Sequence, residues 1–410
     1  MFTMNAEPYG VYLHIPFCLR RCGYCDFFST EGMGKRIPAY IRALTREIES
    51  AGGAGGTPFV DSVFFGGGTP SLLAPRSAGR LLDGIRKSFR LDPEAEITLE
   101  ANPGTVDRDR LKAFHGTGIN RLSLGVQSAD DGELRMLGRV HLYAEAERTY
   151  RDARRAGFAD INLDFIFGLP GQSVTSWTRT LGRALALAPE HLSLYALTLE
   201  RGTELARAVR RGALPAPDAD AAADMYERAE EMLAAAGYRH YEISNWARDA
   251  ATVPDPGRGN RLAAFFPAYA CRQNLRYWLN RPYLGFGAGA HGCAAGKRYA
   301  NICSVEKYIE RMRTGNARRF PLTPAASRSA NQTREEELRE TMWLGLRLTE
   351  AGVDREAYRI RFGEDYYDRF RKEIDSSIAG GLLEWTRNGE ALRLTPRGRL
   401  LGNQVFQLFV

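Results

Sequence analysis

The chain has 410 residues, which is too long for one small hydrophobic core and predicts two or three domains. It is 44% hydrophobic and 26% charged, as globular proteins are, and its net charge of +7 indicates a solvated surface or attraction to acidic partners. No apolar run approaches the roughly 20 residues that cross a bilayer, and the start MFTMNAEPYG lacks the regions of a secretory signal. We therefore expect a cytoplasmic protein with reduced cysteines and no transmembrane segment, which leaves peripheral membrane contact open.

Short apolar runs alternate with helix-period stretches over the first two thirds of the chain. The runs predict strands at residues 11–15, 60–65, 97–101, 121–126, 161–167, 192–199 and 241–244. Apolar strands separated by helices indicate a parallel sheet covered on both faces, so we expect an α/β fold with a partial (β/α)6 TIM-like barrel. Polar and glycine-rich residues follow the strands, as at 66–69 and 102–104, and they predict a site at the carboxyl ends.

The last third of the chain differs in composition. A loop of low apolar content at about 247–264 contains PDPGRGN, and an aromatic and glycine-rich segment follows at 271–292. Helical patterns, two short strands around a turn and a terminal helix then predict a helical, winged-helix-like domain. We expect three segments: 1–245, 246–320 and 321–410. Acidic Glu384 and Glu390 lie near basic Arg397 and Arg399, so we expect this domain not to bind nucleic acid.

Three cysteines, Cys18, Cys22 and Cys25, lie in the stretch HIPFCLRRCGYCDFFS with C-x3-C-x2-C spacing. Three thiolates on one loop can bind three irons of a [4Fe–4S] cubane and leave the fourth iron open to a small molecule. A zinc site with His14 as the fourth ligand is the alternative, although its spacing is not the pair-plus-pair of zinc modules. Chance clustering of three buried cysteines, without any metal, is the second alternative.

The C-x3-C-x2-C spacing at the end of the first strand is similar to the radical S-adenosylmethionine (radical SAM) signature. Residues 9–300 resemble the coproporphyrinogen III oxidase-like group of that superfamily, through the blocks YLHIPFC, FFGGGTPSLL, LEANPGT, RLSLGVQS, NLDFIFGLPGQ, YALTLERGTEL and YEISNWA. The resemblance implies that SAM chelates the open iron and that the reduced cluster passes one electron to its sulfonium.

The same resemblance implies the residues that bind SAM. Glu100 corresponds to the acidic residue that meets the ribose or amino group of SAM, and Tyr12 lies near its methionine or adenine end. The loop at the amino group corresponds to Gly66, Gly67, Gly68 and Thr69. Further SAM-contacting positions correspond to Gln127, Asp164 and Arg139, the last of which could pair with the SAM carboxylate.

Within the group, the chain resembles the branch of HemW-type haem chaperones. The oxidases carry a fourth cysteine two residues after the third, and Phe27 stands there in this chain. The branch has a His-Asn-x-x-Tyr-Trp motif thought to serve haem binding, and the corresponding run begins with Gln273. A glutamine amide is a poor iron ligand, so haem binding would use another residue, with His291, His240 and Cys271 as candidates.

The resemblance thus implies a haem chaperone that retains a [4Fe–4S] cluster and SAM and passes haem to an acceptor protein, such as a respiratory one. Its implied partners are haem or porphyrin and an electron donor such as flavodoxin or ferredoxin. The alternatives are a radical SAM enzyme that decarboxylates coproporphyrinogen, a radical SAM methyltransferase, and a binding-only zinc protein.

Overall fold

The computed structural model describes residues 7–52, 58–249, 265–316, 318–386 and 388–410. The loop expected at 247–264 therefore lies mostly outside the described residues. The chain divides into two compact units, one of residues 1–229 and 282–331 and one of residues 230–281 and 332–410. The three segments expected from the sequence stay a prediction. Among the described residues, no helix has the length and apolar character needed to span a bilayer.

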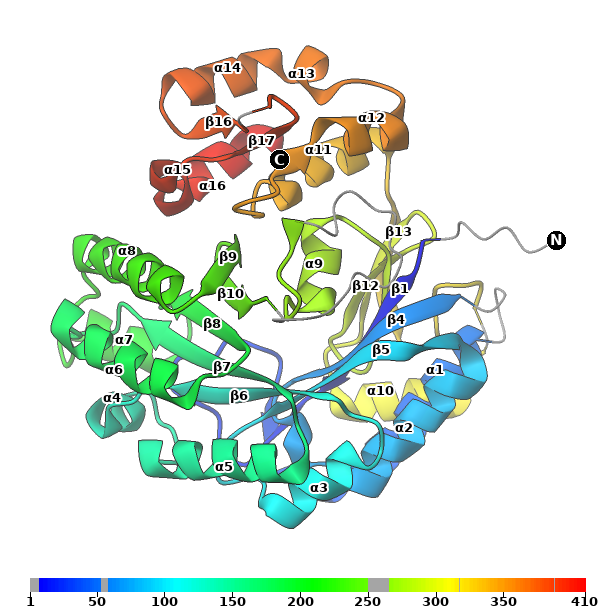
Figure 1. Cartoon of the computed structure of the whole chain (residues 1–410). Coiled ribbons are helices and arrows are strands. Elements are labelled where there is room, and N and C mark those ends of the chain that lie inside the picture. The colour runs from blue at the N-terminus through cyan, green and yellow to red at the C-terminus, as the bar shows by residue number, and fades with distance from the viewer. Residues whose placement is uncertain (1–6, 53–57, 250–264, 317, 387) are drawn as a thin grey trace. The chain divides into compact units, whose positions relative to one another are not determined.

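Six parallel strands form the sheet at the centre of the first unit. In spatial order they are β1 (Tyr9–Ile15), β4 (Phe59–Gly67), β5 (Arg90–Ala101), β6 (Arg121–Gln127), β7 (Asp160–Phe167) and β8 (His191–Ala196). Helices connect them and lie outside the curved sheet (Figure 1): α1 (Ile37–Gly52), α2 (Pro75–Ser88), α3 (Arg108–His115), α4 (Asp131–Met136), α5 (Tyr143–Ala156) and α6 (Val174–Leu187). The expected partial (β/α)6 barrel is confirmed. The strand expected at 192–199 ends earlier, at Ala196, where the chain leaves the sheet.

The apolar periodicity explains how the barrel is covered. On α1, buried Tyr40, Leu44 and Ile48 recur at helical spacing and face the sheet, and α2 does the same with Leu81, Leu82 and Ile85. Alternate residues of β1, such as Val11 and Leu13, are fully buried toward this helical layer. The opposite faces of the strands point into the barrel and carry polar side chains.

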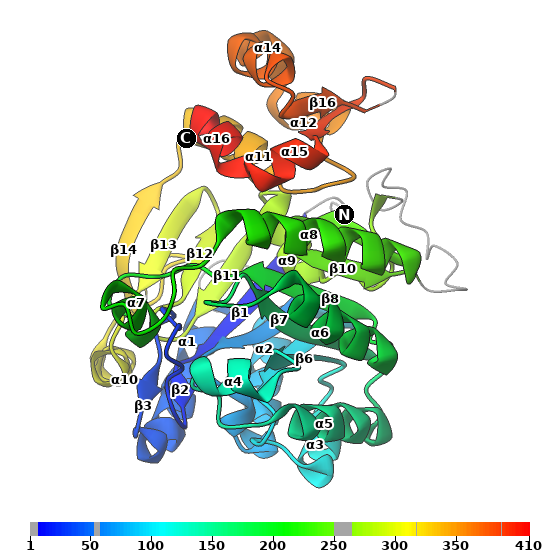
Figure 2. The same ribbon diagram turned by 90° about the vertical axis from the view of Figure 1, so that its left-hand side faces the viewer.

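The other edge of this sheet is extended by four short strands beside β1 (Figure 2). They are β11 (Tyr283–Phe286), which is parallel to β1, and the antiparallel β12 (His291–Ala294), β13 (Lys297–Asn301) and β14 (Ala326–Asn331). Helix α10 (Val305–Thr314) joins β13 to β14 and packs on α1. The first unit also contains β2 (Phe17–Cys18), β3 (Thr30–Glu31) and α7 (Glu204–Arg210), and α8 (Ala219–Ala235) crosses into the second unit.

The second unit is mainly helical. Its core includes Leu338, Met342, Tyr358, Phe370 and Leu392. Its strands are β9 (Tyr238–Glu242), β10 (Asn245–Arg248), β15 (Val353–Asp354), β16 (Leu383–Trp385) and β17 (Ala391–Leu394), and the last three form an antiparallel sheet in the order β15-β17-β16. Its helices are α9 (Arg272–Trp278), α11 (Arg334–Gly345), α12 (Arg355–Phe362), α13 (Tyr366–Arg369), α14 (Arg371–Ala379), α15 (Pro396–Leu400) and α16 (Gly402–Phe406). The part of this unit from residue 332 onward is mainly helical and carries the three-stranded antiparallel sheet, and its likeness to a winged helix stays a prediction.

Candidate SAM and cluster site

A cavity of ≈ 540 Å³ lies in the first unit at the carboxyl ends of the barrel strands. Of the residues expected at the site, ten line this cavity: Cys18, Cys22, Cys25, Gly67, Gly68, Thr69, Glu100, Gln127, Arg139 and Asp164. Parallel strands bring these distant positions together because all their carboxyl ends meet at one edge. Tyr12 and Gly66, also expected there, are not among the lining residues.

The loop that carries the three cysteines is held in place by its main chain. The N–H of Gly23 donates to the carbonyl of Leu137 (3.2 Å), and the carbonyl of Gly23 accepts from the N–H of Leu205 (2.8 Å). The loop is therefore fixed to the end of α4 and to α7 (Figure 2). Between the second and third cysteines, Tyr24 packs against Leu137 and Leu205 in a small apolar cluster. This anchoring sets the positions of the three thiols before any ligand binds.

A chain of polar side chains connects two of the thiols. Thr69 Oγ1 donates to Cys18 Sγ (3.7 Å), and Asn102 Nδ2 donates to Thr69 Oγ1 (3.1 Å). Asn102 Oδ1 accepts from Arg139 Nη2 (2.6 Å), while Arg139 Nη1 donates to Cys22 Sγ (3.4 Å). Donors therefore point at both sulfurs, although burial raises the pKa of the Cys18 thiol. The thiolate is the form that ligates iron.

The glycine loop after β4 fits closely around the cysteine loop. A Cβ at Gly68 would lie 2.8 Å from the carbonyl oxygen of Phe17 and 3.0 Å from Cys18 Sγ. Any residue other than glycine would therefore displace the sulfur or the carbonyl. The N–H of Gly68 donates to the carbonyl of Ile15 (2.9 Å), which holds the two loops together. The residues therefore fit an iron–sulfur cluster: three thiols share one cavity, with hydrogen-bond donors at two of them.

Two carboxylates face the cavity from neighbouring parts of the barrel. Glu100 Oε2 accepts from the N–H of Gly67 (3.1 Å). Burial, together with the nearby charge of Asp164, raises the pKa of Glu100 to about 8. Burial also raises the pKa of Asp164. A cationic ligand would favour the ionised form of both groups, so the pair suits a positively charged small molecule.

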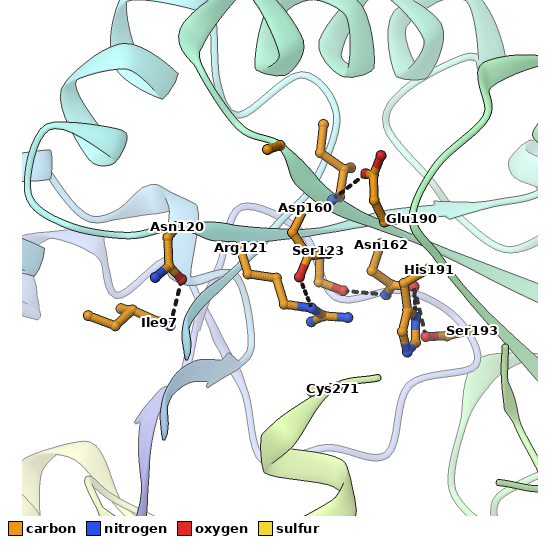
Figure 3. Close-up of polar contacts among 12 residues, drawn as sticks. Ile97, Asn120, Arg121, Ser123, Asp160, Asn162, Glu190, His191, Ser193 and Cys271 are labelled. Carbon is orange, nitrogen blue, oxygen red and sulfur yellow. Dashed lines mark hydrogen bonds and ion pairs between the residues drawn. The ribbon is translucent and has the colours of Figure 1, made fainter. Parts of the chain in front are cut away.

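The position of Asp164 is set by side chains deeper in the barrel. Ser123 Oγ and Asn162 Nδ2 donate to its two carboxylate oxygens (3.0 and 2.8 Å). Figure 3 shows the layer beneath: Asn162 Nδ2 also donates to Ser123 Oγ (2.8 Å), and Asn162 Oδ1 accepts from Ser193 Oγ and bonds His191 Nδ1. The barrel interior below the cavity is therefore a fixed polar network.

Gln127 has a backbone conformation that a glutamine seldom adopts. Its φ is 70°, in the left-handed region, and the register between β6 and β7 shifts beside it. Strain of this kind costs of order 1–3 kcal/mol and persists where the surrounding structure enforces it, commonly at functional sites. Here it accompanies the placement of Gln127 at the cavity wall.

Tyr12 and His14 lie beside the cavity and bond each other. Tyr12 Oη and His14 Nδ1 are 2.9 Å apart, and His14 Nε2 bonds the carbonyl of Phe28 (2.8 Å). Both ring nitrogens of His14 are therefore occupied, so a zinc site with His14 as the fourth ligand would require both bonds to break. Among the described residues, no group of His, Cys, Asp and Glu is arranged to hold a single metal ion.

The sequence prediction named ten residues of the cavity wall and missed others that line it, among them Tyr24, Ser123, Gly125 and Tyr195. Asn102 also lines the cavity and belongs to the run 102–104 that the sequence places after a strand, at the expected site. Tyr24 could have been found because it lies between two of the cysteines. The main-chain carbonyl of Gly125 accepts from Arg139 Nη2 (2.7 Å), and no sequence pattern predicts such a main-chain contact.

Three residues considered for haem lie in the second unit. Gln273 is 1% exposed, and its amide donates to the Tyr277 hydroxyl (2.9 Å). His240 stacks on Trp246 and bonds Glu230 and the carbonyl of Ile243 with its two ring nitrogens. Cys271 is also 1% exposed. In this structure none of the three offers a ligand atom to a large molecule.

Comparisons with known proteins agree with this geometry. The family model of the radical SAM superfamily matches residues 12–184, and that of the HemN C-terminal domain matches residues 332–401. The solved coproporphyrinogen III oxidase HemN from Escherichia coli superposes with a TM-score of 0.79 at 24% identity, covering 98% of this chain and 90% of that one. At that identity the likeness shows the fold. The barrel, the cysteine loop and the family match define a radical SAM protein, and this superfamily implies a [4Fe–4S] cluster and SAM.

Relatives of known name narrow the family further. The chain is 36% identical over 407 residues to "Heme chaperone HemW" of Mycobacterium tuberculosis strain H37Rv, covering 98% of this chain and 95% of the relative. It is 34% identical over 402 residues to the protein of that name from Bacillus subtilis, covering 98% and 99%. The chain belongs to the HemW family.

Proposed function

We propose that the cavity of the first unit binds a [4Fe–4S] cluster through Cys18, Cys22 and Cys25, with SAM beside it. The observation that carries this proposal is the chain of hydrogen bonds from Cys18 to Cys22 through Thr69, Asn102 and Arg139, which directs donors at two sulfurs in one cavity. Bound there, cluster and SAM would supply one-electron chemistry.

The chain's own residues would orient SAM. Glu100 and Asp164 would accept hydrogen bonds from its amino or hydroxyl groups, and the glycine loop would allow close approach of its methionine end. Arg139 already donates to Cys22, Asn102 and Gly125, so it would hold the cysteine loop in place. It would bind the SAM carboxylate with the part of its guanidinium that these contacts leave free. Tyr12 would act indirectly, through His14, which lies against Gly67.

A single substitution tests the cluster assignment. Cys22→Ala should remove the iron and sulfide of the anaerobically reconstituted protein and its absorbance near roughly 400 nm. Cys303→Ala is the matched control, because Cys303 is an exposed free cysteine outside the cavity. Full iron and sulfide in Cys22→Ala would refute the assignment.

We further propose that the chain is a haem chaperone, as the name of its relatives says of them, and that it carries haem to acceptor proteins. Phe27 supports this role over that of an oxidase, because the cysteine-loop position that carries a fourth cysteine in the oxidases is here a side chain 71% exposed. An electron donor such as flavodoxin or ferredoxin, a respiratory acceptor and a cytoplasmic location complete the proposal.

Haem titration of the reconstituted protein, followed by product analysis with SAM and a porphyrinogen, tests this role. A saturable Soret shift at one haem per chain, without carbon dioxide or S-adenosylhomocysteine among the products, is the expected result. Carbon dioxide from coproporphyrinogen would support the oxidase instead, and S-adenosylhomocysteine would support a methyltransferase.

A further inference from the structure

The histidines of the chain differ sharply in what they can bind. All six lie within the described residues. Three are buried, with at least one ring nitrogen bonded to the protein: His14, His141 and His191. His240 has both ring nitrogens occupied. An iron ligand needs an accessible imidazole nitrogen, so none of these four can bind a large planar ligand without rearrangement.

The two remaining histidines differ in their surroundings. His115 ends α3 and is half-buried, with its ring edge-on against Phe158 (5.1 Å between centroids). His291, the first residue of β12, is exposed, and its ring makes no hydrogen bond with any described residue. His291 is therefore the histidine whose imidazole is most available to a ligand from solution.

The strand register places His291 on the face of the sheet away from α1 and α10. Its neighbour Gly292 pairs with Tyr299, which occupies the opposite face, since it is buried near Glu47 of α1. A Cβ at Gly285 would lie 1.8 Å from the carbonyl oxygen of His291, so glycine is required for β11 to approach β12 this closely. The main chain of His291 is thus fixed, and its side chain points to the barrel side.

Residues opposite one another across the strands form one row on this face. Ala300 pairs with His291 on one side and with Arg328 of β14 on the other. In the other direction, beyond Gly285, lie Tyr12 and Phe64, whose rings stack with centroids 6.2 Å apart. On one side of His291 lies the small Ala300, and on the other lies Gly285, whose Cβ position is filled by the His291 carbonyl. An aromatic surface lies at one end of the row.

The other end of this row carries the guanidinium group of Arg328. Arg328 is exposed and forms no ion pair with any described residue. It lies two strand spacings from His291, about 10 Å along the row. An arginine binds a carboxylate strongly through paired N–H donors. Imidazole, small residues, aromatic rings and a guanidinium in one row suit an iron tetrapyrrole with carboxylate side chains.

We propose that His291 is an axial ligand of haem iron on this face and that Arg328 receives a haem propionate. This inference rests on the proposed haem-carrying role and gives it a site that does not involve residue 273. Haem would coordinate through the lone pair of one imidazole nitrogen, and no bond of the macrocycle would change.

Titration of the full, anaerobically reconstituted chain with hemin tests the inference. His291→Ala should lower hemin affinity by about tenfold or more and change the spin state of the bound iron, and added imidazole should restore the spectrum. His115→Ala is the matched control and should bind as the wild type does. Circular dichroism of each variant, together with a His291→Gln variant, separates loss of a ligand from loss of the fold.

The role of Arg328 is tested with two forms of the ligand. Arg328→Gln should weaken hemin binding several-fold but leave the binding of hemin dimethyl ester, which has no carboxylates, unchanged. Arg313→Gln, on α10 at the opposite face, should affect neither. If His291→Ala and Arg328→Gln both bind hemin with wild-type affinity and spectrum, the inference is wrong while the haem-carrying role stands. If the wild type binds no hemin, both are overturned.

Discussion

Gly67→Ala perturbs the junction between the glycine loop and the barrel interior. Gly67 has a φ of +116°, and a left-handed conformation costs an alanine roughly 1–2 kcal/mol. The added Cβ would lie 2.7 Å from Cε1 of His14, which is buried and bonded at both ring nitrogens and so cannot turn aside. Overpacking of this kind adds roughly 1–3 kcal/mol. We expect a total loss of about 2–5 kcal/mol in the free energy of unfolding of the first unit.

Two other glycines separate these contributions. Gly104 has a φ of +83° but no atom within 4 Å of its Cβ position, so Gly104→Ala should show the backbone cost alone, about 1–2 kcal/mol. Gly34 has open space and no positive φ, and Gly34→Ala should be near neutral. Urea unfolding of the apo chain and the dissociation constant for SAM measure the effects. If Gly67→Ala and Gly104→Ala unfold within about 0.5 kcal/mol of each other, the contact with His14 does not constrain the loop.

Three further predictions concern buried ionisable residues. Glu47 accepts four hydrogen bonds in the core, so Glu47→Gln leaves buried donors without an acceptor and should cost about 1–3 kcal/mol in urea unfolding, whereas exposed Glu49→Gln should cost almost nothing. Arg139→Met leaves two buried acceptors without their donor and should cost about 2–4 kcal/mol and lower the iron content, with exposed Arg135→Met as control; equal iron in both would contradict the role of Arg139. The pKa of Glu100 is raised to about 8, so the folded apo chain keeps a proton that the unfolded chain loses, and stability should fall as pH rises from about 4.5 to 8. Glu100→Gln should remove about 2–4 kcal/mol of that decline between pH 5 and 8, and an unchanged slope in urea midpoints would refute this.

The barrel was largely predictable because its strands depend on local signals, whereas the residues of the candidate SAM site were expected from the resemblance to radical SAM proteins. Six of the seven predicted runs gave the six parallel strands, whereas the run at 241–244 overlaps only the end of β9, which pairs antiparallel with β10. The residues that follow parallel strands meet at one edge whatever the packing between them. Glu100 and Asp164 ended up at one cavity for this reason. The spacing of the cysteines is local too, and the loop that carries them needs only to follow the first strand.

The extension of the sheet could not be predicted in the same way. β12 reads HGCA and β13 reads KRYAN, and neither carries an alternation of apolar and polar residues. These strands form because β11 offers an edge and because Glu47 of α1 holds Gly287 and Asn301, contacts distant in sequence. β5 likewise begins at Arg90, earlier than its apolar run at 97–101, since its sheet pairing extends past the polar residues around Pro93.

The structure gives the glutamine at position 273 less bearing on haem binding than the sequence alone suggests. A side chain on α9 that is 1% exposed and bonded to Tyr277, one helical turn onward, points into the protein, and a histidine in that place would be covered as well. Loss of the imidazole there therefore removes no accessible iron ligand from this conformation. The accessible imidazole belongs to His291, on the same sheet face as Tyr12 and next to His14, which lies against Gly67 of the cavity wall. A haem bound at His291 would thus lie on the same face of the sheet as Tyr12, whose hydroxyl bonds His14.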